Sequence, residues 1–136
     1  MNHETYINRI CDYHCLIVED NIQAAEIMSI YLERNGITSE VAENGQDGLQ
    51  LYLNNPLAYS AVFTDLQMPV MKGVEMMTRI RESSLPNSRT IPIIAMSGTY
   101  TGYMTGKDGF NYFLKKPFEM RRLAEIIQEV RQSADD

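Results

Sequence analysis

Five short apolar runs, separated by segments with helical spacing, constrain the fold of this chain more than any other feature. The runs occupy residues 14–18, 39–42, 61–64, 91–96 and 112–114. Short runs of this kind are typical of buried strands in a parallel sheet, whereas the segments between them repeat apolar residues every three or four positions. The alternation predicts a parallel sheet with helices on both faces, joined by right-handed crossovers.

Length and charge limit the classes of protein to which the chain can belong. Its 136 residues suffice for one domain with its own core, and its net charge of −6 disfavours nonspecific binding to nucleic acid or to an anionic membrane. No stretch reaches the roughly 20 apolar residues of a membrane span, and the N-terminus lacks the apolar core of a signal peptide. Cys11 and Cys15 have no second pair, so neither a disulfide framework nor a zinc site is supported. We expect a cytoplasmic domain that does not insert into a membrane.

The domain boundaries follow from the ends of these patterns. We expect residues 1–12 to be a linker or disordered lead-in, residues 13–133 to form the folded domain, and residues 134–136 to be a tail. The last helical pattern ends close to the C-terminus, which leaves no room for a DNA-binding module. The chain is therefore expected to be a stand-alone domain or one excised from a longer protein, without direct DNA binding.

One acid stands at the end of the third apolar run. The segment AVFTDLQMPVMKG, residues 61–73, places Asp65 where the predicted strand gives way to a loop. In an open α/β sheet, ligands bind at the carboxyl ends of the strands. A lone Asp at such a position is more often a solvated loop residue or a helix cap, so the interpretation of Asp65 depends on the other strand ends.

Polar side chains also stand at the ends of other predicted strands. They are Glu19 and Asp20 after the first strand, Ser97 at the end of the fourth, and Lys115 and Lys116 after the fifth. Because parallel strands share one carboxyl edge, we expect these groups to converge with Asp65. Clustered carboxylates repel one another unless a cation is present, and hard oxygen ligands suit Mg²⁺. A lysine and a serine suit an anion with several oxygens, so the whole set describes phosphoryl chemistry.

With these residues the chain, from about residue 14 to residue 130, resembles the receiver domain of bacterial two-component response regulators, the CheY-like superfamily. The matching motifs are LIVEDN, DLQMP, the Ser97-Gly98 strand end and KKPF, in order on the predicted strands. The resemblance implies a flavodoxin-like, doubly wound (βα)5 fold of strand order 2-1-3-4-5. It also implies a signalling switch rather than an enzyme, one that catalyses only its own phosphorylation and dephosphorylation.

The resemblance implies a role for each residue that matches a motif. Asp65 would be the phosphoacceptor, which takes a phosphoryl group from a phosphohistidine on a histidine kinase or phosphotransfer domain. Mg²⁺ (or Mn²⁺) would be bound by Asp20, Asp65 and the main-chain carbonyl of Gln67, with Glu19 acting through water. Lys116 would pair with the phosphoryl oxygens, and its peptide bond to the following proline is expected to be cis.

Two further residues would carry the switch. Ser97 would move toward the phosphoryl group, and Phe113 would be the aromatic residue that follows it. The family often has Tyr in this place, and Phe113 lacks its hydroxyl, so we expect a switch that acts by packing or a weak switch. An aromatic residue in a buried strand is also commonly a core residue. Lys115 is interpreted as a solvated neighbour, and His3 and His14 are assigned no role.

The segment before the fifth strand departs from the family pattern. It is nearly one helical turn too short for the family's helix at this place, and it contains Gly102, Gly106 and Gly109, which are unfavourable in a helix interior. We expect this fourth helix to be shortened or irregular. The family's usual output surface lies on this side, so the sequence leaves the output partner open.

Two other functions fit a fold of this class. A pseudo-receiver would be a phosphorylation-independent binding module, and it would typically lack one or more members of the acid–acid–serine–lysine set. A flavodoxin-like enzyme or cofactor carrier would need a Gly-rich phosphate loop after the first strand, where Asp20-Asn21 stands. The sequence therefore favours a phosphoacceptor receiver domain that switches the binding of a partner.

Overall fold

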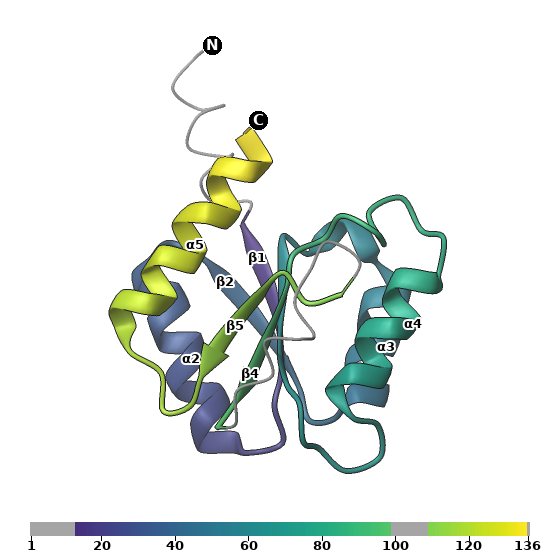
Figure 1. Ribbon diagram of the computed structural model, residues 1–136, viewed down its shortest axis with the longest axis horizontal. Helices are drawn as coiled ribbons and strands as arrows, with labels where there is room; N and C mark the ends of the chain where they lie inside the picture. Colours follow the sequence, from purple (N-terminus) through teal and green to yellow (C-terminus); the bar gives the residue numbers. More distant parts are fainter. Residues whose placement is uncertain (1–12, 99–108, 136) are drawn as a thin grey trace.

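A five-stranded parallel sheet lies between two layers of helices (Figure 1). The computed structural model describes residues 13–98 and 109–135. Its strands are β1 (His14–Val18), β2 (Thr38–Ala42), β3 (Ala61–Asp65), β4 (Ile93–Ser97) and β5 (Tyr112–Lys115). The strand order is β2-β1-β3-β4-β5, and every neighbouring pair is parallel. The predicted flavodoxin-like order 2-1-3-4-5 is therefore confirmed.

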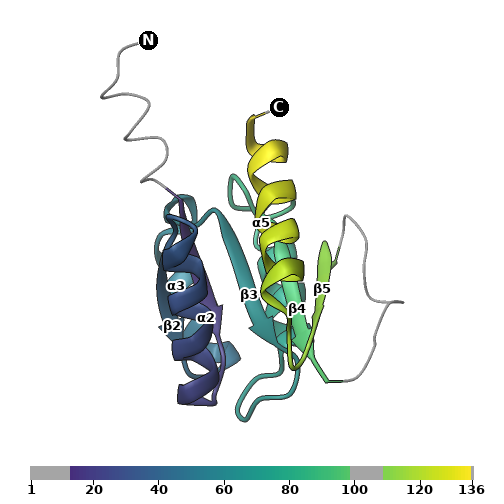
Figure 2. The same ribbon diagram turned by 90° about the vertical axis from the view of Figure 1, so that its left-hand side faces the viewer.

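The helices cover both faces of the sheet. They are α2 (Ile22–Arg34), α3 (Gly45–Asn54), α4 (Gly73–Glu82) and α5 (Met120–Asp135), with a 3-10 turn η1 (Pro56–Ala58) before β3. Helices α2 and α5 lie on one face and α3 and α4 on the other (Figure 1). The face covered by α2 and α5 is turned toward the viewer in Figure 2. The expected shortened helix at 99–108 and the expected lead-in at 1–12 lie outside the described residues, so both stay predictions.

Local capping explains where α2 begins and ends. The Asn21 side chain accepts a hydrogen bond of 2.9 Å from the Ala24 amide, so Asn21 and not Asp20 caps the helix. Gly36 follows the helix with φ of 76°, the left-handed conformation that glycine adopts at little cost. The carboxylate of Asp20 is therefore not used to cap α2.

The last helix buries apolar residues that recur at helical spacing. Leu123, Ile126, Ile127 and Val130 are all buried on the face of α5 that packs against the sheet. Among the described residues, no helix is long and apolar enough to cross a membrane.

The start of β4 differs from the expected strand over residues 91–96. The strand begins at Ile93 and extends to Ser97, because Pro92 has no amide hydrogen for the ladder. The carbonyl of Pro92 still accepts a hydrogen bond of 2.9 Å from the Val62 amide. Ser97 is therefore the last residue of a strand and not the first residue of a turn.

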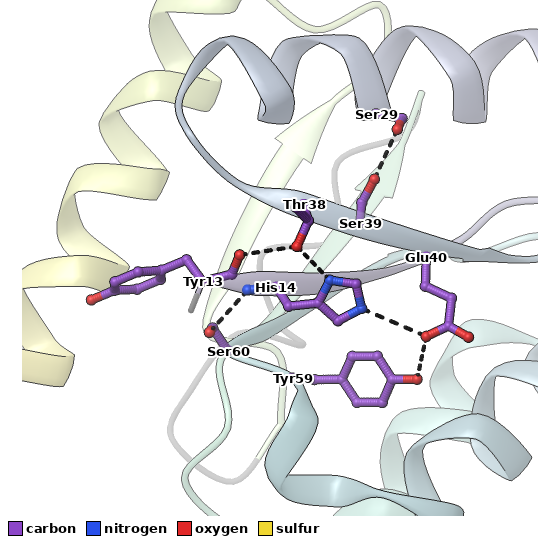
Figure 3. Close-up of polar contacts among 8 residues, drawn as sticks. All are labelled: Tyr13, His14, Ser29, Thr38, Ser39, Glu40, Tyr59 and Ser60. Atoms are coloured by element: carbon purple, nitrogen blue, oxygen red, sulfur yellow. Dashed lines mark hydrogen bonds and ion pairs between the residues drawn. The ribbon is translucent and has the colours of Figure 1, made fainter. Parts of the chain in front are cut away.

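His14 belongs to a polar cluster at the amino edge of the sheet (Figure 3). Its ring stacks on Tyr59, with 5.6 Å between the centroids, and its Nδ1 lies 2.7 Å from the Thr38 hydroxyl. Glu40 accepts a hydrogen bond of 2.8 Å from the Tyr59 hydroxyl and lies 3.6 Å from His14 Nε2. These contacts join β1 and β2 to Tyr59 in the segment between η1 and β3, at the edge opposite the strand ends that carry the acids.

Candidate functional site

Three carboxylates converge at the carboxyl edge of the sheet. Glu19, Asp20 and Asp65 each offer an oxygen within 4.8 Å of the other two. The parallel pairing of Val18 with Thr64 brings the acids that follow these two residues side by side. Their burial is graded, since Glu19 is buried, Asp65 is half-buried and Asp20 is exposed. This oxygen donor set, with an open side for water, fits a hard divalent cation such as Mg²⁺.

Glu19 is the most deeply buried of the acids, with 3% of its surface exposed. Burial raises the pKa of its carboxyl group, the hydrogen bond from Lys116 lowers it, and the nearby Asp65 charge raises it again. Lys116 Nζ donates to one carboxylate oxygen, and the Asn21 amide donates to the other at 3.3 Å. The ammonium group therefore supplies a positive charge to the acidic cluster.

Lys116 reaches a second acid as well. Its Nζ lies 3.6 Å from Oδ2 of Asp65, and its amide donates a 2.8 Å hydrogen bond to the Ser97 carbonyl. The Lys116–Pro117 peptide bond is cis, as predicted. Lys115 is exposed, whereas Lys116 is half-buried against the acids, so the structure distinguishes these two neighbours.

Ser97 lies on the strand next to Asp65. Asp65 pairs with Met96, and Ser97 follows as a buried residue that is 8% exposed. Phe113 is half-buried on β5 and packs against the core beneath α3 and α4, which suits a core residue. Gln67 is exposed two residues beyond Asp65. The predicted site residues thus lie at or near one edge, except that Phe113 lies within its strand.

The backbone of Asp65 is held tightly against the start of α4. The Gly73 amide donates a 3.2 Å hydrogen bond to the Leu66 carbonyl. A Cβ atom at Gly73 would lie only 2.4 Å from the Asp65 carbonyl oxygen, so no larger residue fits without movement. The Thr64 hydroxyl donates to the same carbonyl at 2.9 Å. These contacts fix the position from which the Asp65 side chain projects.

Sequence reasoning missed two residues in the loop that follows Asp65. Val70 has φ of 71° and is 79% exposed, and Lys72 is the N-cap residue of α4 without a side-chain capping bond. The unfavourable cap at Lys72 could have been recognised in the sequence, since N-cap residues are usually Ser, Thr, Asp or Asn. The left-handed backbone of Val70 could not have been recognised in the sequence, because it depends on the geometry of the whole turn.

The fold and the acidic edge define a receiver domain. Residues 15–128 match the family of the response regulator receiver domain, and the chain belongs to this family. It is therefore a domain of two-component signalling, a switch and not an enzyme of the ordinary kind.

One similar protein is the peroxide stress-activated histidine kinase mak1 of Schizosaccharomyces pombe, which is 34% identical over 123 residues. The match covers 87% of this chain and 8% of that kinase, so the chain corresponds to a small part of its length.

Two solved structures are similar in fold and in sequence. The receiver domain of sensor histidine kinase PA1611 from Pseudomonas aeruginosa, with magnesium coordinated in its active site cleft, has a TM-score of 0.73 at 26% identity. That match covers 86% of this chain and 95% of the other. A co-crystal structure of the Saccharomyces cerevisiae histidine phosphotransfer protein Ypd1 with the receiver domain of Ssk1 has a TM-score of 0.72 at 27% identity. It covers 87% of this chain and 88% of the other.

Proposed function

We propose that this domain takes a phosphoryl group onto Asp65 from a phosphohistidine on a histidine kinase or phosphotransfer domain, and that the modification switches partner binding. The observation that carries the proposal is the convergence of the Glu19, Asp20 and Asp65 carboxylates with the Lys116 ammonium group. A carboxylate nucleophile, a hard-cation site and a lysine are the parts that phosphoryl transfer requires.

The proposed step is a displacement at phosphorus. A carboxylate oxygen of Asp65 forms the new P–O bond while the P–N bond to the donor histidine breaks. The imidazole nitrogen keeps the electron pair and takes up a proton from solvent. Lys116 then shifts its hydrogen bonds from Glu19 toward the phosphoryl oxygens, and the Ser97 hydroxyl donates to the same group. Phe113 is proposed to repack after Ser97 moves.

The proposed cofactor is Mg²⁺ (or Mn²⁺), held by Asp20, Asp65 and the main-chain carbonyl of Gln67, with Glu19 acting through water. When bound, such an ion neutralises charge between the anionic nucleophile and the anionic phosphoryl group. The three converging carboxylates support this assignment, as does the magnesium named in the PA1611 receiver structure.

The proposed donor follows from the relatives. One similar receiver forms a co-crystal with a histidine phosphotransfer protein, and another similar sequence lies within a histidine kinase. The donor proposed here is therefore a phosphohistidine protein, met in the cytoplasm, and the output partner is a second protein that distinguishes the two states of the domain.

The test is intact-mass measurement after incubation with acetyl phosphate, with and without Mg²⁺. We expect the wild type to gain one phosphoryl group only when Mg²⁺ is present, and Asp65→Asn to gain none. If the folded wild type gained no phosphoryl group from this donor or from a phosphohistidine protein, the domain would be a pseudo-receiver that binds partners without phosphoryl chemistry.

A further inference from the structure

A glycine at the start of α3 lies against the loop of residues 66–72, which joins Asp65 to α4. The Gly45 amide donates a 3.2 Å hydrogen bond to the Met71 carbonyl. A Cβ atom at Gly45 would lie 2.4 Å from that carbonyl oxygen and 3.0 Å from its carbon. Atoms that are not bonded pack at roughly 3.5 Å, so a side chain here would push the helix and the loop apart by about 1 Å.

The backbone of Gly45 does not itself require a glycine. Among the glycines of the described residues, only Gly36 has a positive φ, and Gly45 is the first residue of α3. Alanine is favoured over glycine in a helix, because glycine loses more conformational freedom on folding. The close approach to Met71 therefore accounts for the glycine, and the Asn44-Gly45 motif marks a tertiary contact as well as a turn.

The contact lies next to the strained residue of the loop. Val70, which precedes Met71, has φ of 71°, and 79% of its surface is exposed, so burial of its own side chain does not hold it there. A conformation of this kind persists only where the surrounding structure imposes it. Met71 is buried, and its carbonyl is bonded to α3. The contact between Gly45 and Met71 is therefore one of the restraints that keep the turn in its strained form.

The rest of the loop is tied to the sheet and to the core. The Leu66 amide donates a 3.2 Å hydrogen bond to a carbonyl of β4, and the Gly73 amide donates to the Leu66 carbonyl at 3.2 Å. Leu66 and Met68, on either side of Gln67, are buried in the core cluster that includes residues of α3 and α4. The main chain at Gln67 is therefore placed by the anchors of a short closed loop, and one of these anchors comes from α3.

We propose that Gly45 is a positioning residue for the Mg²⁺ site, and that it sets the place of the Gln67 carbonyl through its contact with Met71. The inference rests on the proposed function, in which that carbonyl is one of the ligands of the metal. Mg²⁺ demands near-ideal octahedral geometry, so a displaced ligand lowers the affinity of the site. Gly45 has no side chain to offer the metal, and its amide is bonded to Met71, so it acts only through the loop.

Two substitutions at the start of α3 test this role. Gly45→Ala adds one methyl group against the Met71 carbonyl. Asn44→Ala keeps the glycine but removes the N-cap, whose side-chain oxygen accepts a 2.8 Å hydrogen bond from the Asp47 amide. It therefore loosens the start of the helix by a milder route.

Tyr52→Phe is the matched control for a general loss of stability. Tyr52 is fully buried toward the other end of α3, and its hydroxyl donates a hydrogen bond to the Asn87 side chain. The substitution removes this bond and adds no atom, so the contact between Gly45 and Met71 keeps its geometry. Urea denaturation without metal measures the free energy of unfolding of each variant.

An NMR titration of amide chemical shifts with MgCl₂, without any phosphodonor, measures the Kd for Mg²⁺ and shows whether each variant is folded. We expect Gly45→Ala to raise this Kd about tenfold and Asn44→Ala about threefold, as for residues that orient a metal ligand. Tyr52→Phe should lose stability and keep the wild-type Kd. With acetyl phosphate, Gly45→Ala should come within about twofold of the wild-type rate once Mg²⁺ is saturating, because only the binding of the metal is weakened.

The outcomes separate this inference from the function on which it rests. If the wild type binds no Mg²⁺, the metal site of the proposed function fails, and the positioning role fails with it. If the wild type binds Mg²⁺ and folded Gly45→Ala binds it equally well, only the positioning role is overturned. Equal rises in Kd for Gly45→Ala and Tyr52→Phe would also overturn it, because lost stability would explain both. If Gly45→Ala does not fold, an unchanged Kd for Asn44→Ala overturns the role.

Discussion

At the scale of single residues, the contact between Lys116 and Glu19 is the most informative feature of the site. Glu19 is a buried acid whose pKa is raised by burial, and its hydrogen bond to Lys116 offsets part of that effect. The same ammonium group lies 3.6 Å from Asp65. Lys116 therefore stabilises the acids and is positioned to respond when Asp65 changes its charge.

Replacing this lysine is expected to weaken the fold as well as the chemistry. Lys116→Met leaves the Glu19 carboxylate without its cation, and the free energy of unfolding at pH 7 should fall by about 1–3 kcal/mol. Urea denaturation measures this loss, and added Mg²⁺ should restore part of it by supplying another positive charge. Lys115→Met is the control, and it should leave stability within about 0.5 kcal/mol of the wild type because Lys115 is exposed. Equal stability of the two variants would contradict this account.

The sequence allowed most of the site to be predicted at this scale. Asp20, Asp65 and Lys116 stand at or just after strand ends, and the parallel pairing of the strands places these ends at one edge of the sheet. The bond between Lys116 and Glu19 could not be predicted, because it depends on side-chain conformations and not on the order of strands. The strain at Val70 escaped prediction for a related reason, since it arises from the geometry of the entire turn.

At the scale of secondary structure, a buried arginine joins α4 to the two strands beyond it. Arg81 is 8% exposed, and its guanidinium donates to the carbonyls of Ser88 and Ile91, at 3.2 and 2.8 Å. It also donates to the Gly109 carbonyl at 2.6 Å and to the Asn111 side chain at 2.9 Å. Arg81 thus fixes the chain at the entry to β4 and at the entry to β5.

Loss of this arginine should destabilise the β5 side of the sheet first. Arg81→Met leaves several buried carbonyls without a donor, and we expect the free energy of unfolding to fall by about 2 kcal/mol or more. Hydrogen exchange should show the largest loss of protection at the amides of Asn111 and β5. Arg79→Met is the matched control, because Arg79 is exposed on the same helix and, within the described part of the chain, forms an ion pair with Glu75 at 3.1 Å. A uniform loss of protection over all five strands would contradict this role.

Lys72 permits a stability prediction that is independent of any partner. Lys72→Asp should raise the free energy of unfolding by about 0.5–1 kcal/mol, because it supplies the missing cap and a charge that suits the helix N-terminus. Urea denaturation at low and high salt measures the gain. Lys72→Ala removes the charge without adding a cap, so it should give only the salt-dependent part of the gain in the free energy of unfolding. A destabilised Lys72→Asp variant would show that Lys72 makes a contact that the domain needs.

Element boundaries were predictable where a cap or a glycine marks them. Asn21, Asn44 and Gly36 lie at helix ends, as their residue types favour. The start of β4 was not predicted, because the apolar run continues through Pro92 while the hydrogen-bond ladder does not. Apolar character reports burial, and burial extends beyond the paired part of a strand.

At the scale of the whole molecule, the two edges of the sheet have different chemistry. The carboxyl edge gathers the acids, and the amino edge holds the cluster of His14, Tyr59 and Glu40 (Figure 3). Burial raises the pKa of Tyr59, and its hydrogen bond to Glu40 raises it further. Burial also raises the pKa values of Tyr52 and Tyr112.

These tyrosines should make the fold sensitive to base. Above pH of about 10, tyrosines in the unfolded chain lose their protons while the folded ones keep theirs. The unfolded state then binds fewer protons, so stability falls as pH rises. Urea denaturation between pH 8 and 11 should show this decline, and Tyr59→Phe should make it shallower. A wild type as stable at pH 11 as at pH 8 would contradict the raised pKa values.

Among the clustered acids, Asp65 is the one that we expect to receive the phosphoryl group. The most direct measurement is to phosphorylate the domain with acetyl phosphate and Mg²⁺, reduce the acyl phosphate with borohydride, and sequence the peptides by mass spectrometry. Reduction converts a phosphorylated aspartate to homoserine, which marks its position. We expect homoserine at Asp65 alone and none without Mg²⁺. Homoserine at Asp20, or no conversion in a folded and phosphodonor-treated domain, would contradict it.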